Sequence, residues 1–247
     1  MAPNDTLAGG DPASFQAAEA AEGTHAHRLN SLRAAVLGAN DGIVSTAGIV
    51  IGVAGASSDP FVILAAGVAG LTAGALSMAV GEYVSVSAQR DTEVALLEKE
   101  RRELEEMPEE ELAELAGLYE AKGLTPELAL EVAVQLHEHD ALAAHAETEL
   151  GIDPDALTSP WIAAISSAIA FTVGSVLPLL AIEFAPADVK IPVTVIGVLA
   201  ALALTGFLSA KAGGTPILRA ILRNVTGGFL AMGITYWIGR LVGHSLG

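Results

Sequence analysis

Three side chains suited to handling ions lie inside long apolar segments of this sequence. Asp41 lies about a third of the way along the apolar segment 32–56, and the preceding Asn40 is a further candidate to line an ion pathway. Met78 and Glu82, in the next apolar segment, are four residues apart and so share one helix face. A carboxylate in hydrocarbon costs roughly 2.5–3.5 kcal/mol, which makes a functional role the default interpretation. These groups can bind a borderline divalent ion, or a carboxylate can carry a proton.

A second group of metal-ligand types lies in the polar segment 91–155. Two pairs of glutamates three residues apart, and one His–Glu pair four residues apart, each place two ligands on one helix face. Such pairs arise by chance in charged helices, so we expect function only if four to six of them converge on one or more divalent ions. The candidate metal ligands are Glu100, Glu103, Glu111, Glu114, His145 and Glu149, with His137, His139 and Asp140 nearby.

The same segment does not carry the pattern of a di-iron oxidase. Ferritin-like sites use Glu-x-x-His on two helices of a bundle, and the sequence has this spacing only at Glu22 and His25, near its start. The chain has no Cys, which excludes disulfides and thiolate metal sites. No nucleophile elbow, phosphate loop or nucleotide fingerprint is present. We therefore expect no enzyme activity and no organic cofactor.

Composition and charge favour a membrane protein with an acidic domain. Hydrophobic residues make up 52% of the chain, the mean hydropathy is +0.52, and the formal net charge is −17. Residues 91–155 hold 20 of the 29 acidic residues and only four of the 12 basic ones. This charge disfavours nucleic acid as a partner and attracts cations. A solvated acidic surface that only aids solubility is the alternative interpretation.

The elements that must position these residues are helices. A bilayer core of about 30 Å needs about 20 apolar residues per helix, and five segments qualify: 33–55, 61–88, 160–182, 191–210 and 219–242. We predict an all-α membrane protein in which a three-helix acidic metal-binding domain is inserted between the second and third spans. The predicted parts are a disordered tail 1–27, spans one and two in 28–90, the acidic domain 91–155, and spans three to five in 156–247.

Within the acidic domain, helix starts and stops are readable. The second span has no breaker before Met107 and Pro108, so its helix should run on to residue 106. A second helix is expected over 109–122, and a third from Thr125 to Gly151. The third helix should bury an apolar face that includes Leu128 and Leu136.

Basic residues predict the orientation in the membrane. Positive charge near membrane ends favours the cytoplasmic side, which places the amino terminus and the acidic domain in the cytoplasm and the carboxyl terminus outside. Five spans cannot divide into two equal halves, so a single copy of the chain offers too few helices to surround an ion path. We therefore expect a homodimer in membrane lipid with the ion path at or near its interface. We expect the location to be a prokaryotic plasma membrane, or a vacuolar or other organelle membrane if the source is a eukaryote. Basic residues near one side are Arg28, Arg33, Arg90, Lys99, Arg101, Arg102, Lys211, Arg219 and Arg223, against Lys190 and Arg240 on the other.

Several motifs resemble the vacuolar iron transporter family, also called nodulin-21-like. They are LRAAVLGANDGIVST at 32–46, SMAVGEYVSVSAQRDTE at 77–93, HDALAAHAETELGI at 139–152 and AFTVGSVLPLL at 170–180. The resemblance implies a dimer of five-span protomers that moves Fe²⁺ or Mn²⁺ out of the cytosol, in exchange for protons. It further implies that Asp41, Met78 and Glu82 line the pathway, and that the six candidate ligands above belong to a metal-binding domain that collects ions.

One departure from the family pattern affects the metal site. Related carriers can have two adjacent Met residues where this chain has His145 and Ala146. The histidine can still bind a transition metal, but one ligand is lost, so the choice between Fe²⁺ and Mn²⁺ stays open. A membrane-anchored metal buffer or sensor without transport is the alternative function. Asp41 and Glu82 argue against it, since an anchor has no need of intramembrane carboxylates.

Overall fold

The computed structural model describes residues 35–246 of the chain. Every regular element in this part is a helix, so the predicted all-α class is confirmed. The predicted tail 1–27, together with Arg28 and Arg33, lies outside the described residues. The described chain forms two compact units, one made of residues up to 79 and from 165 onward, the other of residues 80–164.

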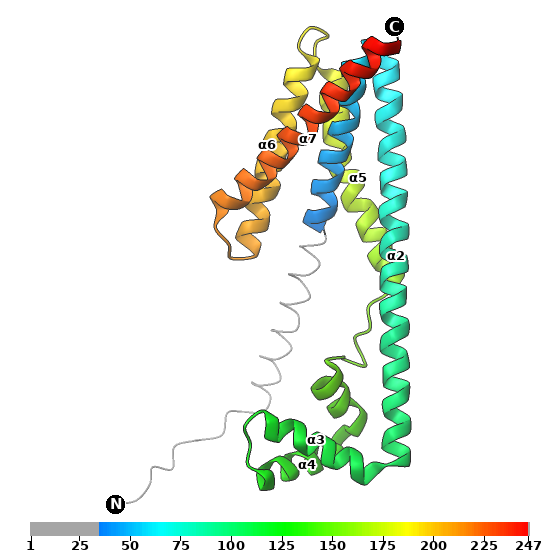
Figure 1. Ribbon diagram of the computed structural model, residues 1–247, viewed down its shortest axis with the longest axis vertical. Helices are drawn as coiled ribbons and strands as arrows, with labels where there is room; N and C mark the ends of the chain where they lie inside the picture. The colour runs from blue at the N-terminus through cyan, green and yellow to red at the C-terminus, as the bar shows by residue number, and fades with distance from the viewer. Residues whose placement is uncertain (1–34, 247) are drawn as a thin grey trace, which may run out of the picture. The chain divides into compact units, whose positions relative to one another are not determined.

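Within residues 35–246, five helices are long and apolar enough to cross a membrane, as predicted (Figure 1). Their bounds lie within a few residues of the predicted spans, except that the second helix continues well beyond its apolar part because no residue breaks it before Met107. The helices are Ala35–Ala56, α2 (Pro60–Glu106), α5 (Pro160–Phe184), α6 (Lys190–Ala212) and α7 (Ile217–Leu246).

Small residues let the Ala35–Ala56 helix and α5 approach closely. A Cβ on Gly42 would lie 2.1 Å from the carbonyl oxygen of Phe171, and Ser175 Oγ donates a hydrogen bond of 3.2 Å to the Gly42 carbonyl. A Cβ on Gly174 would lie 2.0 Å from the Ala39 carbonyl oxygen. Helices in lipid associate through such close packing, and these contacts hold the helix that carries Asp41 against α5.

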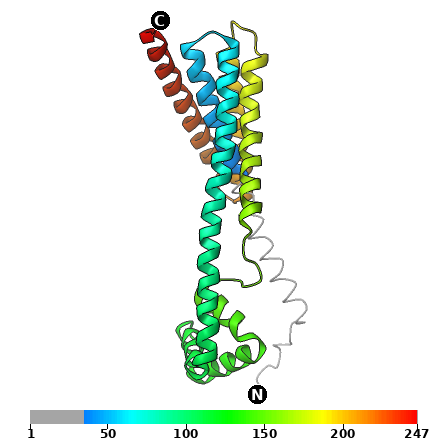
Figure 2. The same cartoon turned by 90° about the vertical axis from the view of Figure 1, so that its right-hand side faces the viewer.

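The core of this unit is apolar and is shared by all its helices. α6 and α7 pack side by side as an antiparallel pair, joined by a turn in which Gly214 has a φ of 61° (Figures 1 and 2). The turn needs glycine there because the left-handed region strains other residues. The largest fully buried core side chains are Val50, Ile51, Val198, Leu202 and Met232.

The other unit is built by the end of α2, α3 (Pro108–Ala121), α4 (Pro126–His145) and η1 (Ala146–Leu150). Pro108 and Pro126 stand at helix starts, where their missing N–H costs nothing. The predicted apolar face of α4 was partly wrong, because Leu128 is 48% exposed. The small Ala129 and Ala133 are buried instead, which brings α3 and α4 close together.

The predicted continuous helix from Thr125 to Gly151 is also wrong, because it breaks at Asp140. The backbone there is extended, with φ −160° and ψ 96°, and Asp140 Oδ1 accepts a hydrogen bond of 2.9 Å from the Ala143 N–H. Asp140 thus caps the helical turn that follows it, which is a role that Asp performs well. The helical segment after Asp140 continues into one π-helical turn, η1. This turn ends at Gly151, where φ is 65°.

Candidate functional site

Three buried side chains meet where α2, α3 and the end of α4 come together. Glu100, Glu111 and His145 offer ligand atoms that all lie within 4.8 Å of one another. Their exposed fractions are 3%, 5% and 0%. Each comes from a different helix, so the packing of the unit itself assembles the group. Two buried carboxylates beside an imidazole form the kind of donor set that suits a divalent transition metal.

The Nδ1 atom of His145 faces carboxylates on several sides. It lies 2.9 Å from Glu100 Oε1 and 3.7 Å from oxygens of both Glu111 and Glu149. Despite the short distance, Nδ1 and Glu100 Oε1 are not aligned as a hydrogen bond, and neither has another partner in the described structure. An unpaired buried polar atom costs about 1–3 kcal/mol. Two ligands about 2.1 Å from one ion and at right angles lie about 3 Å apart, so a bound cation would satisfy both atoms.

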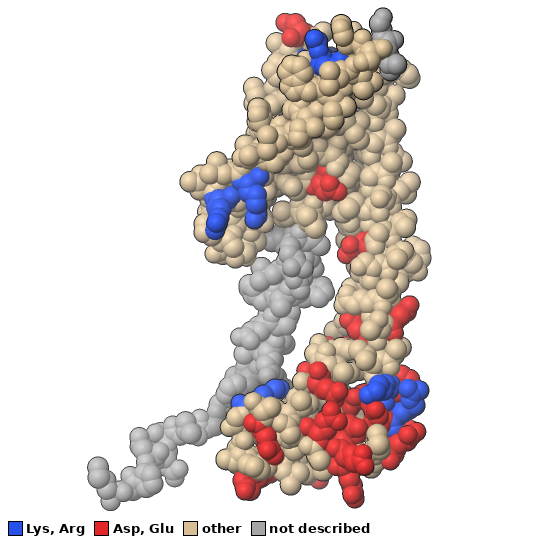
Figure 3. Space-filling view, viewed as in Figure 1, with Lys and Arg blue, Asp and Glu red and all other residues tan. Residues whose placement is uncertain are grey.

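The electrostatics of the cluster also favour a cation. Burial, followed by the negative charges of Glu149 and Glu111, raises the pKa of Glu100 to about 7. Burial and the charge of Glu114 raise the pKa of Glu111, while His145 acts in the opposite direction. Carboxylates held this way resist ionisation until a positive charge joins them. Acidic side chains also gather over the visible surface of this unit, as Figure 3 shows.

Of the six candidate ligands, the structure brings four together and leaves two outside the cluster. Glu149 reaches His145 from η1, as their spacing predicted. Glu103 pairs instead with Lys99 one turn earlier on α2, and Glu114 is exposed on α3. Both excluded carboxylates lie close enough to raise the pKa of a clustered one. They therefore add negative charge around the site without facing its centre.

A second imidazole contacts His145 from α4. The Nε2 atoms of His137 and His145 lie 2.9 Å apart, at hydrogen-bond distance. Burial and the neighbouring His145 lower the pKa of His137. Sequence reasoning named His137 only as a nearby candidate. No spacing signal could have revealed the contact, because residues eight apart in a straight helix are separated by about 12 Å.

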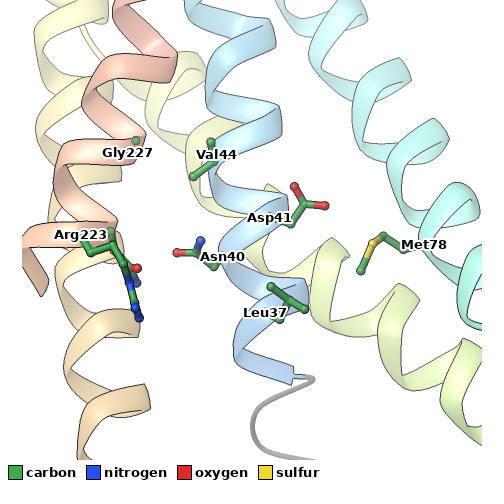
Figure 4. Close-up of a pocket in the computed structure, with 9 residues that line it drawn as sticks. Leu37, Asn40, Asp41, Val44, Met78, Arg223 and Gly227 are labelled. Atoms are coloured by element: carbon green, nitrogen blue, oxygen red, sulfur yellow. The ribbon is translucent and has the colours of Figure 1, made fainter. Parts of the chain in front are cut away.

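The second site is a pocket of about 500 Å³ in the unit that holds the membrane helices. Asn40, Asp41 and Met78 all line it, as does α7 (Figure 4). Asp41 and Met78 face each other across the pocket, while Asn40 points toward α7. Asp41 Oδ1 accepts a hydrogen bond of 2.8 Å from Ser45 Oγ, and Asn40 Oδ1 accepts one of 3.3 Å from Thr205 Oγ1 of α6. Two polar side chains are thus held in place on one apolar helix.

Two α7 residues that are not among the predicted pathway residues also line this pocket. Arg223 and Asn224 lie in its wall, so a fixed positive charge shares the space with Asp41. The sequence could have suggested both residues, because they are polar side chains next to an otherwise apolar segment. Glu82, the remaining pathway candidate, belongs to the unit of residues 80–164, where it is partly buried.

Comparison with known proteins places the chain among named relatives. It matches the model of the VIT family over residues 32–240. It is 47% identical over 211 residues to a protein of Acanthamoeba castellanii named vacuolar iron transporter, covering 85% of this chain and 78% of that protein. It is 37% identical to vacuolar iron transporter homolog 4 of Arabidopsis thaliana, covering 90% and 89%, and 37% identical to homolog 5 of Oryza sativa subsp. japonica, covering 87% and 82%.

Proposed function

We propose, because this chain belongs to the VIT family, that it is an integral membrane transporter that carries Fe²⁺, Mn²⁺ or both out of the cytosol. The family resemblance inferred from the sequence motifs is confirmed. Five apolar helices agree with an integral membrane protein. The observation that supports transport over metal binding alone is the hydrogen-bonded carboxylate of Asp41, which lies in an apolar helix and lines a pocket together with Met78.

In this proposal the unit of residues 80–164, here called the acidic unit, binds ions before they enter the membrane pathway. Glu100, Glu111, His145 and Glu149 bind a divalent cation, which replaces the proton that Glu100, with its raised pKa of about 7, still carries in part at neutral pH. The surrounding carboxylates, Glu103 and Glu114 included, raise the local concentration of cations. A mixed nitrogen and oxygen donor set suits Fe²⁺ and Mn²⁺ and does not by itself choose between them.

The membrane pocket supplies the pathway. Asp41 and Met78 face each other in it and can pass a borderline divalent ion between an oxygen and a thioether. We assign Asn40 and Glu82 to the same path. A proton returns through a carboxylate and resets it, which makes the protein a metal/proton antiporter. We further propose a homodimer in a prokaryotic plasma membrane, or in a vacuolar or other organelle membrane, with the amino terminus in the cytoplasm.

A membrane-anchored metal buffer or sensor is the second candidate function. The buried cluster favours it as much as it favours transport, because a buffer needs the same ligands. The two functions differ in what they require of Asp41, which lies in a different unit from the cluster. A buffer has no use for a hydrogen-bonded carboxylate in an apolar helix.

The deciding experiment measures Fe²⁺ and Mn²⁺ flux into proteoliposomes under an imposed pH gradient. The wild type is compared with Asp41→Asn, which keeps the side-chain size, and with Asp59→Asn in the exposed turn before α2. The proposal expects gradient-driven flux in the wild type and in Asp59→Asn, and its loss in Asp41→Asn. Absence of flux from folded, oriented wild type that still binds metal would leave only the buffer.

A further inference from the structure

The contact between His137 and His145 has a consequence for how an ion can bind. A neutral imidazole carries one N–H and one lone pair, and only the lone pair can bind a metal. Nδ1 of His145 faces the carboxylates of the cluster, so this is the nitrogen placed to bind an ion. The proton of His145 must then sit on Nε2, which lies 2.9 Å from Nε2 of His137.

We propose that His137 is a positioning residue that fixes the tautomer of His145, leaving Nδ1 free to bind the divalent cation. His137 accepts the hydrogen bond from the Nε2–H of His145 through its own Nε2 lone pair, and keeps its own proton on Nδ1. Metal-binding histidines generally donate their second N–H to a partner in this way, which sets both tautomer and ring orientation. This inference rests on the proposed loading role of the acidic unit.

The surroundings of His145 support this tautomer over the other one. With the proton on Nδ1, the N–H would point among the carboxylates, yet Nδ1 makes no aligned hydrogen bond with Glu100 Oε1 at 2.9 Å. The opposite ring edge does have a suitably placed acceptor in His137. His145 is also fully buried, so water does not compete for either nitrogen. The polar partner of its outer nitrogen is therefore supplied by the protein.

The break at Asp140 makes this contact possible. In a straight α4 the two histidines would be about 12 Å apart along the helix axis, whereas the extended backbone of Asp140 turns the second segment back toward the first. The feature is local to this chain, since it depends on an imidazole at position 145. A thioether at that position would have no N–H for His137 to accept.

The test uses the full chain in detergent micelles and titrates Mn²⁺ into four proteins. They are the wild type, His137→Ala, His137→Gln and, as a matched control, His139→Ala, which removes an exposed histidine from the same helix. Loss of an outer-shell partner typically weakens metal binding 10–100-fold, so we expect that loss for His137→Ala. His137→Gln, whose amide oxygen can accept the same hydrogen bond, should restore affinity to within about threefold of the wild type, and His139→Ala should match the wild type.

A spectroscopic measurement on the wild type needs no variant to fold. Nitrogen-15 NMR of histidine-labelled protein with Zn²⁺ as the diamagnetic probe should show His145 with metal on Nδ1 and a proton on Nε2. Metal on Nε2, or metal on His137 itself, would overturn the inference. Equal Mn²⁺ affinity of His137→Ala and the wild type would do the same, as would equal losses in the Ala and Gln variants.

Failure of this inference is distinguishable from failure of the loading site. The double variant Glu100→Gln with Glu111→Gln removes two proposed ligands and leaves His137 in place. If it binds Mn²⁺ as tightly as the wild type, the loading site itself is wrong and the role of His137 falls with it. If it loses Mn²⁺ while His137→Ala does not, the loading site stands and only the tautomer assignment is overturned.

Discussion

Glu100 and His145 lie 2.9 Å apart in a buried place without forming a hydrogen bond. A protein interior rarely leaves such atoms unpaired, because they lose their bonds to water and gain none in return. In our proposal, a cation that binds between them compensates this loss. The residues that destabilise the unit without metal would then be the ones that bind the ion.

Metal affinity should depend on pH through Glu100. Its pKa is raised to about 7, so below pH 7 most Glu100 carboxyl groups without metal carry a proton that a binding ion must displace. We expect Mn²⁺ affinity to rise as the pH increases toward 7 and to level off above it. Calorimetry in two buffers of different ionisation enthalpy should record about one proton released per ion at pH 6 and fewer at pH 8.

The control for this pH dependence is Glu100→Gln, which cannot hold the proton and should make Mn²⁺ affinity nearly independent of pH. Affinity that is independent of pH between 5.5 and 7 in the wild type would contradict this account.

The stability of the acidic unit without metal should change with pH in the opposite direction. A carboxyl group whose pKa is higher in the folded state than its ordinary value of 4.5 favours folding when protonated. Stability without metal should therefore fall as the pH rises from about 4.5 to 7.

At the scale of elements, the break in α4 is the feature that places His145 in the cluster. Asp140 accepts a hydrogen bond from the Ala143 N–H and starts a new helical segment that carries His145. The π-helical turn that follows, ended by Gly151, places Glu149 beside His145. The cluster thus depends on an interruption that helix propensity would not favour.

Replacing Asp140 should straighten α4 and weaken metal binding. Asp140→Ala removes the cap, which is worth about 0.5–2 kcal/mol, and inserts the best helix former. We expect helical content to stay the same or rise while Mn²⁺ affinity falls, measured by circular dichroism and by titration. Asp140→Asn keeps a capping oxygen and should retain binding. Equal affinity of the Ala variant and the wild type would show that the break does not position His145.

A second prediction at the scale of elements follows from the close packing of the membrane helices. In Gly42→Ala the new methyl group would meet the Phe171 carbonyl oxygen of α5, so the helices must separate. Overpacking of this kind costs about 1–3 kcal/mol, and we expect a lower melting temperature in detergent. Gly233→Ala on α7 is the matched control, because no atom of the described structure lies within 4 Å of its added Cβ. The same melting temperature in both variants would rule out close packing at Gly42.

For the whole molecule, the two units imply two separable defects in transport. Glu100→Gln in the acidic unit should raise the ion concentration needed for half-maximal flux and leave the maximal rate nearly unchanged. Asp41→Asn in the membrane unit should lower the maximal rate at every ion concentration and leave Mn²⁺ binding to the acidic unit intact. Flux curves in proteoliposomes, together with binding curves in detergent, distinguish the two. A fall in maximal rate with Glu100→Gln alone would place that carboxylate on the pathway itself.

Much of the architecture follows from the sequence. The number of spans was predictable because the thickness of the bilayer sets a length of about 20 apolar residues, and length and composition are sequence properties. Helix starts at Pro108 and Pro126 were predictable because proline suits the first turn. The acidic ligand types were predictable too, since the concentration of carboxylates in 91–155 is visible without a fold.

The convergence of particular side chains was decided by tertiary structure. Glu100 and Glu103 have the same spacing as Glu111 and Glu114, yet one member of each pair is buried and the other is not. Spacing reports which residues share a helix face, whereas the rotation of each helix about its axis, set by core packing, decides which of them turns inward. Sequence alone therefore established that side chains able to bind metal are present. Helix packing and the break at Asp140 decided which of them meet.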